Sequence, residues 1–139
     1  MARILIIEDD DGLRPLLRLM LQREGYETAE AREGDEGLRL CAAAPFDLVL
    51  CDILMPGREG LETITELRKE HPATRVIAMS GGLGLSGMDP LRIASLLGAC
   101  RTIAKPFRMD RLLRVVADAL AEPPSGTPTS AALARESER

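Results

Sequence analysis

Two kinds of segment alternate along this sequence, and the alternation restricts the possible folds more than any other feature. Continuous apolar runs occupy residues 4–7, 48–51 and 76–79, and a weaker run occupies residues 102–104. Runs of this length are typical of strands in a parallel sheet that is covered on both faces. The more polar segment 26–31 is interpreted as a strand at the edge of that sheet. The sequence therefore predicts five short strands.

Between these runs, apolar residues recur every three or four positions, which is the period of a helix packed on a sheet. Five such stripes occur, and they begin at Leu13, Leu38, Leu61, Ile93 and Met109. The first consists of Leu13, Leu16, Leu17, Met20 and Leu21, and the fourth of Ile93, Leu96 and Leu97. These stripes predict five helices whose apolar side chains lie in the core. Gly25 is expected to end the first helix, because glycine is common just past a helix C-terminus.

Five strand–helix units predict an α/β fold with a single doubly wound, five-stranded parallel sheet and five flanking helices. The expected strand order is the flavodoxin-like 2-1-3-4-5. We expect one domain over residues 1–121, since a chain of 139 residues suits a single domain. Residues 122–139 are rich in Pro, Ser and Thr and then charged, which is typical of a tail or linker.

Composition excludes several classes of function. The net charge is −4 without any basic block, and aromatic residues make up 2%, so we expect no direct binding to nucleic acid. No apolar run approaches the length of a signal peptide core or a membrane span, so no membrane insertion is expected. The cysteines (Cys41, Cys51 and Cys100) are too widely spaced for a disulfide framework or a zinc site. Buried thiols in a reducing cytoplasm are the expected reading.

Polar side chains interrupt the apolar pattern where the predicted strands end. Glu8 and Asp9 follow the first strand, and Asp52 follows the third. Ser80 follows the fourth strand, and Lys105 follows the fifth. The carboxyl ends of parallel strands lie on one edge of the sheet, where ligands of open α/β folds bind. We therefore expect these side chains to form one pocket.

The residue types in this pocket indicate phosphoryl chemistry. Clustered carboxylates repel one another and need a hard cation, and oxygen ligands that leave room for water suit Mg²⁺. Lys105 offers a point charge for phosphoryl oxygens, and Ser80 offers a hydroxyl donor. Asp52 is then a candidate nucleophile toward phosphorus, with Mg²⁺ and Lys105 neutralising charge during in-line transfer.

Four motifs, in order, give the chain a family resemblance. They are ILIIEDD, DLVLCDILMPGREG, VIAMSG and AKPF, each with an apolar strand or its polar end. Together they resemble the receiver domains of bacterial two-component response regulators. The resemblance runs from about Arg3 to Leu120, which is nearly all of the predicted domain.

The resemblance implies a role for each matching position. Asp52 matches the phospho-acceptor, which takes its phosphoryl group from a histidine kinase or a phosphotransfer protein. Glu8, Asp9 and Asp52 match the Mg²⁺ ligands, together with the backbone carbonyl of Leu54. Asp10 and Asp11 are assigned instead to the start of the first helix, with Asp11 as its N-cap.

The same resemblance implies a phosphoryl-binding and switching group. Ser80, Gly81 and Lys105 match the residues that contact the phosphoryl group and report its presence. The Lys105–Pro106 peptide bond is expected to be cis, as is usual in the family. Thr102 departs from the pattern, because the family often has an aromatic switch residue there. The glycine-rich loop 81–87 is expected to carry much of the conformational response instead.

The resemblance implies a cytoplasmic signalling switch that is not an enzyme. Leu54 and Gly82 have no polar group to position an attacking water, so we expect slow self-dephosphorylation. The face made by the fourth helix, fifth strand and fifth helix would then bind a downstream protein or a second copy of the chain.

Two other functions remain open. A degenerate receiver could act as a phosphorylation-independent protein-binding module. A phosphatase of the haloacid dehalogenase type is less favoured, because Leu54 stands where that chemistry needs a second aspartate.

Overall fold

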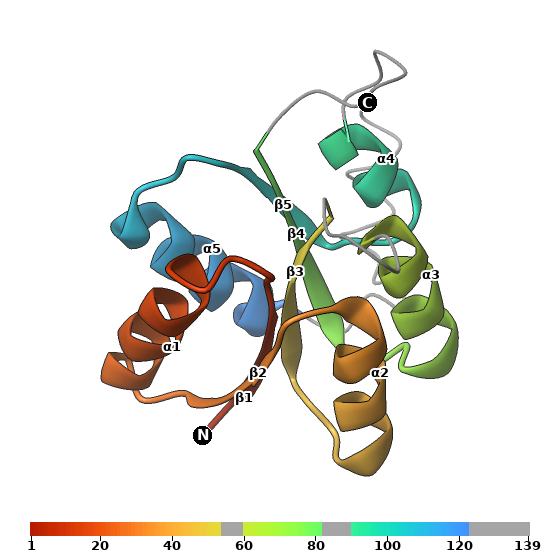
Figure 1. Ribbon diagram of the computed structural model, residues 1–139, viewed down its shortest axis with the longest axis horizontal. Coiled ribbons are helices and arrows are strands. Elements are labelled where there is room, and N and C mark those ends of the chain that lie inside the picture. Colours follow the sequence, from red (N-terminus) through yellow and green to blue (C-terminus); the bar gives the residue numbers. More distant parts are fainter. Residues whose placement is uncertain (54–59, 82–89, 123–139) are drawn as a thin grey trace.

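Strands and helices alternate strictly along the computed structural model, which describes residues 1–53, 60–81 and 90–122 (Figure 1). The strands are β1 (Arg3–Ile7), β2 (Glu27–Ala31), β3 (Leu48–Asp52), β4 (Arg75–Ser80) and β5 (Arg101–Ala104). The helices are α1 (Leu13–Arg23), α2 (Gly34–Ala43), α3 (Gly60–Glu70), α4 (Pro90–Leu96) and α5 (Met109–Ala121). All ten elements lie where the sequence predicts them. The expected tail lies outside the described residues, except for Glu122.

The sheet has the predicted order, β2-β1-β3-β4-β5, and every neighbouring pair is parallel. β2 lies at one edge, which explains why its segment is less apolar than the others. β1 and β3 are neighbours in the middle of the sheet, with Ile7 opposite Cys51. The strand order reverses at β1, so the switch point beyond the ends of β1 and β3 is where open α/β sheets bind their ligands.

Helices cover both faces of the sheet. Helices α2, α3 and α4 lie on one side, and α1 and α5 lie on the other (Figure 1). Successive residues of β1 point to opposite faces: Leu5 and Ile7 join the first layer, whereas Ile4 and Ile6 join the second. All four are fully buried. This two-sided burial is the physical reason for a continuous apolar run in place of an alternating one.

The ends of α1 correct one prediction and confirm another. Asp11 is not the N-cap, because the helix begins one position later and Gly12 occupies that place. Asp10 satisfies the free backbone groups instead: its Oδ1 accepts from the N–H groups of Gly12 at 2.7 Å and Leu13 at 3.0 Å. At the other end, Gly25 has a positive φ of 94° just past the helix, as expected.

Three of the predicted core positions are wrong. Leu16 of α1 is 44% exposed, Leu96 at the end of α4 is 76% exposed, and Leu97 just after it is 38% exposed. Leu16 lies at the margin of its apolar stripe, in which Leu17 and Leu21 are fully buried, whereas Leu96 and Leu97 lie where α4 ends. Among the described helices, none is both long enough and apolar enough to cross a lipid bilayer.

Candidate functional site

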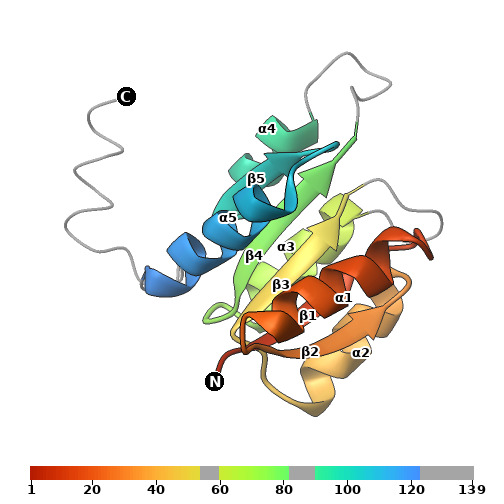
Figure 2. The same ribbon diagram turned by 90° about the vertical axis from the view of Figure 1, so that its left-hand side faces the viewer.

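The predicted site residues meet at the carboxyl edge of the sheet, toward which the arrowheads in Figure 2 point. Glu8 directly follows β1, Asp52 and Ser80 end β3 and β4, and Lys105 directly follows β5. Glu8 is held in line with the sheet, because its backbone N–H donates to Ala31 of β2 at 3.0 Å. Residues up to 97 positions apart in the sequence therefore become neighbours.

Three carboxylates form the centre of the site. Glu8, Asp9 and Asp52 each offer one oxygen, and these oxygens lie within 4.8 Å of one another. Glu8 is fully buried and Asp52 is 4% exposed, whereas Asp9 is partly exposed. Three anionic groups this close, two of them out of water, repel strongly unless a cation or a proton intervenes.

Lys105 reaches into this cluster and supplies one positive charge. Its Nζ lies 2.5 Å from Oε1 of Glu8 and 3.4 Å from Oδ2 of Asp52. Burial alone would lower the pKa of Lys105, but the hydrogen bond to Glu8 and the charge of Asp52 outweigh burial and raise that pKa. The ammonium group therefore stays charged at the mouth of the site.

Glu8 shows that one lysine does not balance the acids. The pKa of Glu8 is raised to about 7, chiefly by burial; the hydrogen bond to Lys105 lowers it, and the neighbouring Asp52 raises it. A raised carboxyl pKa in a carboxylate cluster means that additional positive charge would be bound favourably. The donor set consists of carboxylate oxygens only, which fits a hard divalent cation such as Mg²⁺. Leu54, whose carbonyl was assigned to the same metal, lies outside the described residues.

The residues assigned to phosphoryl binding lie beside Lys105. Ser80 is 2% exposed, and its backbone carbonyl accepts from the N–H of Lys105 at 2.7 Å. Gly81 lies against the same side chain, since a Cβ built there would be 3.6 Å from Cβ of Lys105. The Lys105–Pro106 peptide bond is cis, as the resemblance implies. Thr102 is half-buried in β5, opposite Ala78 of β4.

Gly60 belongs to the site, although the sequence showed it only as the last residue of a motif. It is the first residue of α3, and its Cα faces the end of β3. A Cβ built on Gly60 would lie 2.4 Å from the carbonyl oxygen of Asp52 and 2.2 Å from Cα of Ile53. Only glycine permits so close an approach of helix and strand. Gly60 therefore helps to fix the backbone of the acceptor candidate.

Arg14 was missed altogether by the sequence analysis. Its Nη1 donates to the backbone carbonyl of Glu8 at 2.9 Å, so it contacts the loop that carries the acidic pair. No sequence signal distinguishes it from the other arginines on helices, because its contact depends on how α1 leaves the sheet. Loop residues 82–89 and Gly82 in particular lie outside the described residues, so the expected loop response stays a prediction.

Comparisons with known proteins agree with this geometry. The sequence profile described as the response regulator receiver domain matches residues 4–117. Sporulation initiation phosphotransferase F of Bacillus subtilis is 34% identical over 110 residues, which are 79% of this chain and 86% of that protein. The chain spans only 54% or less of the transcriptional regulatory proteins that it matches first.

Solved structures give the same result. A CheY-like receiver domain protein from Methanospirillum hungatei superposes with a TM-score of 0.80 at 31% identity, covering 86% of this chain and 94% of that one. Response regulator protein TrrA of Thermotoga maritima, solved in complex with Mg²⁺ and BeF, superposes with a TM-score of 0.74 at 34% identity. This second match covers 86% of the present chain and 99% of TrrA.

Proposed function

The chain belongs to the family of response regulator receiver domains, and on this basis we propose that Asp52 accepts a phosphoryl group from a histidine kinase or a phosphotransfer protein. Receiver domains are in general phospho-acceptors that bind Mg²⁺ in an acidic pocket. The observation that carries the proposal is the contact of Lys105 with both Glu8 and Asp52 inside a cluster of three carboxylates. No other group of His, Cys, Asp and Glu with metal-binding spacing occurs in the described part of the chain.

In the proposed reaction, a carboxylate oxygen of Asp52 forms a bond to phosphorus while the phosphorus–nitrogen bond of a phosphohistidine breaks. The departing histidine nitrogen keeps the electron pair, so atoms and charges balance without a further reactant. Glu8, Asp9 and Asp52 would hold Mg²⁺, which supplies positive charge to the phosphoryl oxygens when it is bound. Asp52 is 4% exposed, which protects the acyl phosphate bond from water.

Lys105 and Ser80 would act on the product. Lys105 already touches the Asp52 carboxylate, so its ammonium can pair with a phosphoryl oxygen through a small movement. The hydroxyl of the buried Ser80 can donate to another phosphoryl oxygen. We propose that these two contacts bias a two-state equilibrium, and that self-dephosphorylation is slow. Thr102 cannot supply an aromatic rotamer switch in this equilibrium.

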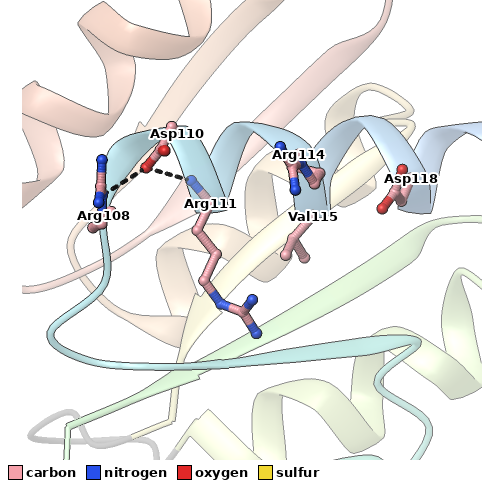
Figure 3. Close-up of a pocket in the computed structure, with 6 residues that line it drawn as sticks. All are labelled: Arg108, Asp110, Arg111, Arg114, Val115 and Asp118. Atoms are coloured by element: carbon pink, nitrogen blue, oxygen red, sulfur yellow. Dashed lines mark hydrogen bonds and ion pairs between the residues drawn. The ribbon is translucent and has the colours of Figure 1, made fainter.

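We propose that the face made by α4, β5 and α5 then binds a downstream protein or a second copy of the chain. The end of α4 leaves Leu96 and Leu97 exposed at 76% and 38%. A hollow of about 240 Å³ lies along α5, and Figure 3 shows that Arg111 and Val115 point to the same side of the helix within it. Both apolar and charged contacts are therefore available to a partner.

We propose a cytoplasmic location, which is supported by the state of the cysteines. Cys41, Cys51 and Cys100 are free thiols, and burial raises the pKa of Cys41 to about 11. Such a thiol stays protonated and unreactive, which suits a reducing compartment.

Intact-mass spectrometry after incubation with acetyl phosphate tests the proposal. One phosphoryl adduct should appear with Mg²⁺ present and be lost after chelation. Asp52→Asn should abolish the adduct while leaving a folded protein. Well-folded wild-type protein that gains no adduct from acetyl phosphate or a histidine kinase would instead support the phosphorylation-independent binding module.

A further inference from the structure

We propose that Arg14 is a positioning residue that sets the affinity of the acidic cluster for Mg²⁺, an inference that rests on the proposed function of that cluster. Arg14 lies in the first turn of α1 and acts through the backbone of Glu8, whose carbonyl accepts a hydrogen bond from its guanidinium. Its side chain is only 12% exposed, so the guanidinium is held in one place.

The guanidinium joins three segments of the chain. Nη1 donates to the backbone carbonyl of Glu8 at 2.9 Å, and Nη2 donates to Oδ1 of Asp11 at 2.7 Å. Nε lies 3.7 Å from Oε1 of Glu30 in β2. Arg14 therefore ties the connection between β1 and α1 to the neighbouring edge strand. Planar donors in a fixed fork suit such a junction, whereas a lysine could not make all three contacts.

The peptide that Arg14 holds is the one that joins two of the metal-ligand candidates. The carbonyl of Glu8 and the N–H of Asp9 belong to the same planar unit. The strand pairing between β1 and β2 ends at Ile7, and the N–H of Glu8 still donates to Ala31 at 3.0 Å, so this peptide unit is the first one beyond the hydrogen bonds to β2. At that point the hydrogen bond from Arg14 to the Glu8 carbonyl holds the peptide unit in place. This one peptide plane therefore influences the orientation of both the Glu8 and the Asp9 side chains. If Arg14 no longer held the plane, both ligand candidates would be misplaced together.

Charge alone would predict the opposite effect, which makes the inference testable. A cation near a metal site disfavours metal binding, so removing Arg14 would strengthen Mg²⁺ binding if electrostatics dominated. Asp11 and Glu30 pair with the guanidinium and offset its charge. Groups that orient metal ligands from outside typically change metal affinity about 10-fold to 100-fold when they are removed. We therefore expect the positional effect to exceed the electrostatic one.

Arg18 provides a matched control on the same helix. Its Nη1 lies 3.0 Å from Oε2 of the same Glu30, but its side chain is 40% exposed and lies one turn further from the site. Arg14→Met and Arg18→Met remove the same charge from the same network. Only the first removes the hydrogen bond to the Glu8 carbonyl.

The experiment is a Mg²⁺ titration of the unphosphorylated full chain. Binding is measured by calorimetry and by the chemical shifts of the backbone amides. Arg14→Met should raise the dissociation constant about 10-fold, and Arg18→Met should change it less than about 2-fold. With acetyl phosphate, Arg14→Met should need more Mg²⁺ for half-maximal phosphorylation yet approach the wild-type rate at saturation. A purely structural role would lower the melting temperature without moving the dissociation constant.

Equal changes in the two variants, or tighter binding by Arg14→Met, would overturn the inference. If Arg14→Met does not fold, Arg14→Lys keeps the charge and the aliphatic stem but loses the fork. That variant should also bind Mg²⁺ more weakly, and wild-type affinity would overturn the inference. Wild-type protein that binds Mg²⁺ without becoming phosphorylated refutes the proposed function alone, and the titrations still decide the role of Arg14. Wild-type protein that binds no Mg²⁺ refutes both.

Discussion

The charge of Glu8 depends strongly on the groups around it. It is fully buried, it lies beside Asp52 in the acidic cluster, and only Lys105 supplies a positive charge by direct contact among the described residues. Its neutral form is therefore favoured in the metal-free protein, and its pKa is raised to about 7. A bound divalent cation favours the charged form, so Mg²⁺ binding and proton release are coupled at this residue.

This coupling predicts how the stability of the metal-free protein depends on pH. The pKa of Glu8 in the folded state, about 7, exceeds the ordinary value of 4.5, so the folded state binds the proton more tightly. The contribution is complete below pH 4.5 and is lost as the pH rises through 7. The free energy of unfolding should fall over this window by at most about 1.4 kcal/mol per pH unit from this group.

Urea denaturation with chelator at pH 5 and pH 8 measures this effect. Glu8→Gln mimics the neutral form, and its stability should fall less between the two pH values than that of the wild type. A fall as steep in Glu8→Gln as in the wild type would show that other groups cause the pH dependence.

Single residues also show how far sequence reasoning reached. Glu8, Asp9, Asp52 and Lys105 could be grouped because polar residues ended apolar runs, and parallel strands bring such ends together. Arg14 could not be found in this way, because its contact with Glu8 depends on the path of the chain from β1 into α1. The same local geometry moved the capping role from Asp11 to Asp10.

Among the elements, the pairing of α3 with β3 is the tightest approach at the site. Gly60 lets the start of α3 touch the backbone of Asp52 and Ile53, with no space for a side chain. Backbone atoms cannot turn aside as the end of a flexible side chain can. The fit between helix and strand therefore depends on one missing methyl group.

Gly60→Ala should destabilise the protein by about 1–3 kcal/mol, the usual cost of overpacking, and it should displace the backbone of Asp52. Thermal denaturation measures the stability, and amide shifts around Asp52 report the displacement. Gly81→Ala is the control, because a Cβ there meets Lys105 only at ordinary distances of 3.6 and 3.8 Å. Equal losses in the two variants would contradict the steric argument.

Helix α4 shows where element prediction fell short. The periodic pattern placed the helix correctly, with Gly98 beyond it at a positive φ of 114°. The pattern could not show that α4 ends at Leu96 and leaves this side chain exposed, since exposure depends on how much of the sheet is left to cover. The spacing of apolar residues shows which face of a helix is apolar, but it does not show how much of that face the rest of the protein covers.

At the scale of the whole molecule, the C-terminal end of α5 is tied to the edge of the sheet that lies opposite the site. The guanidinium of Arg75 donates to the backbone carbonyl of Glu122, with Nε at 3.0 Å. Arg101 of β5 forms an ion pair with the carboxylate of the same residue. The first residues of β4 and β5 thus hold the point where α5 ends.

Arg101→Met should lower the free energy of unfolding by about 0.5–1 kcal/mol, because it removes the ion pair with Glu122 and this pair is partly exposed. Hydrogen exchange at the last turn of α5 should become faster, while Mg²⁺ binding stays unchanged. Arg108→Met is the control at the other end of α5, where the pair with Asp110 is exposed at 86% and 68%. Unchanged exchange in Arg101→Met would show that α5 is held by its apolar face alone.

The residues of the site come from the segment after β1, the ends of β3 and β4, and the residue after β5, so they are synthesised at different times. A ribosome delivers Glu8 and Asp9 first and Lys105 nearly last within the domain, because translation runs from the N-terminus. In a nascent chain, Asp52 is present before its partner Lys105 has been synthesised. We therefore expect that Asp52 is not phosphorylated at this stage. The ability to accept a phosphoryl group would then appear only when the last strand of the receiver domain has been synthesised.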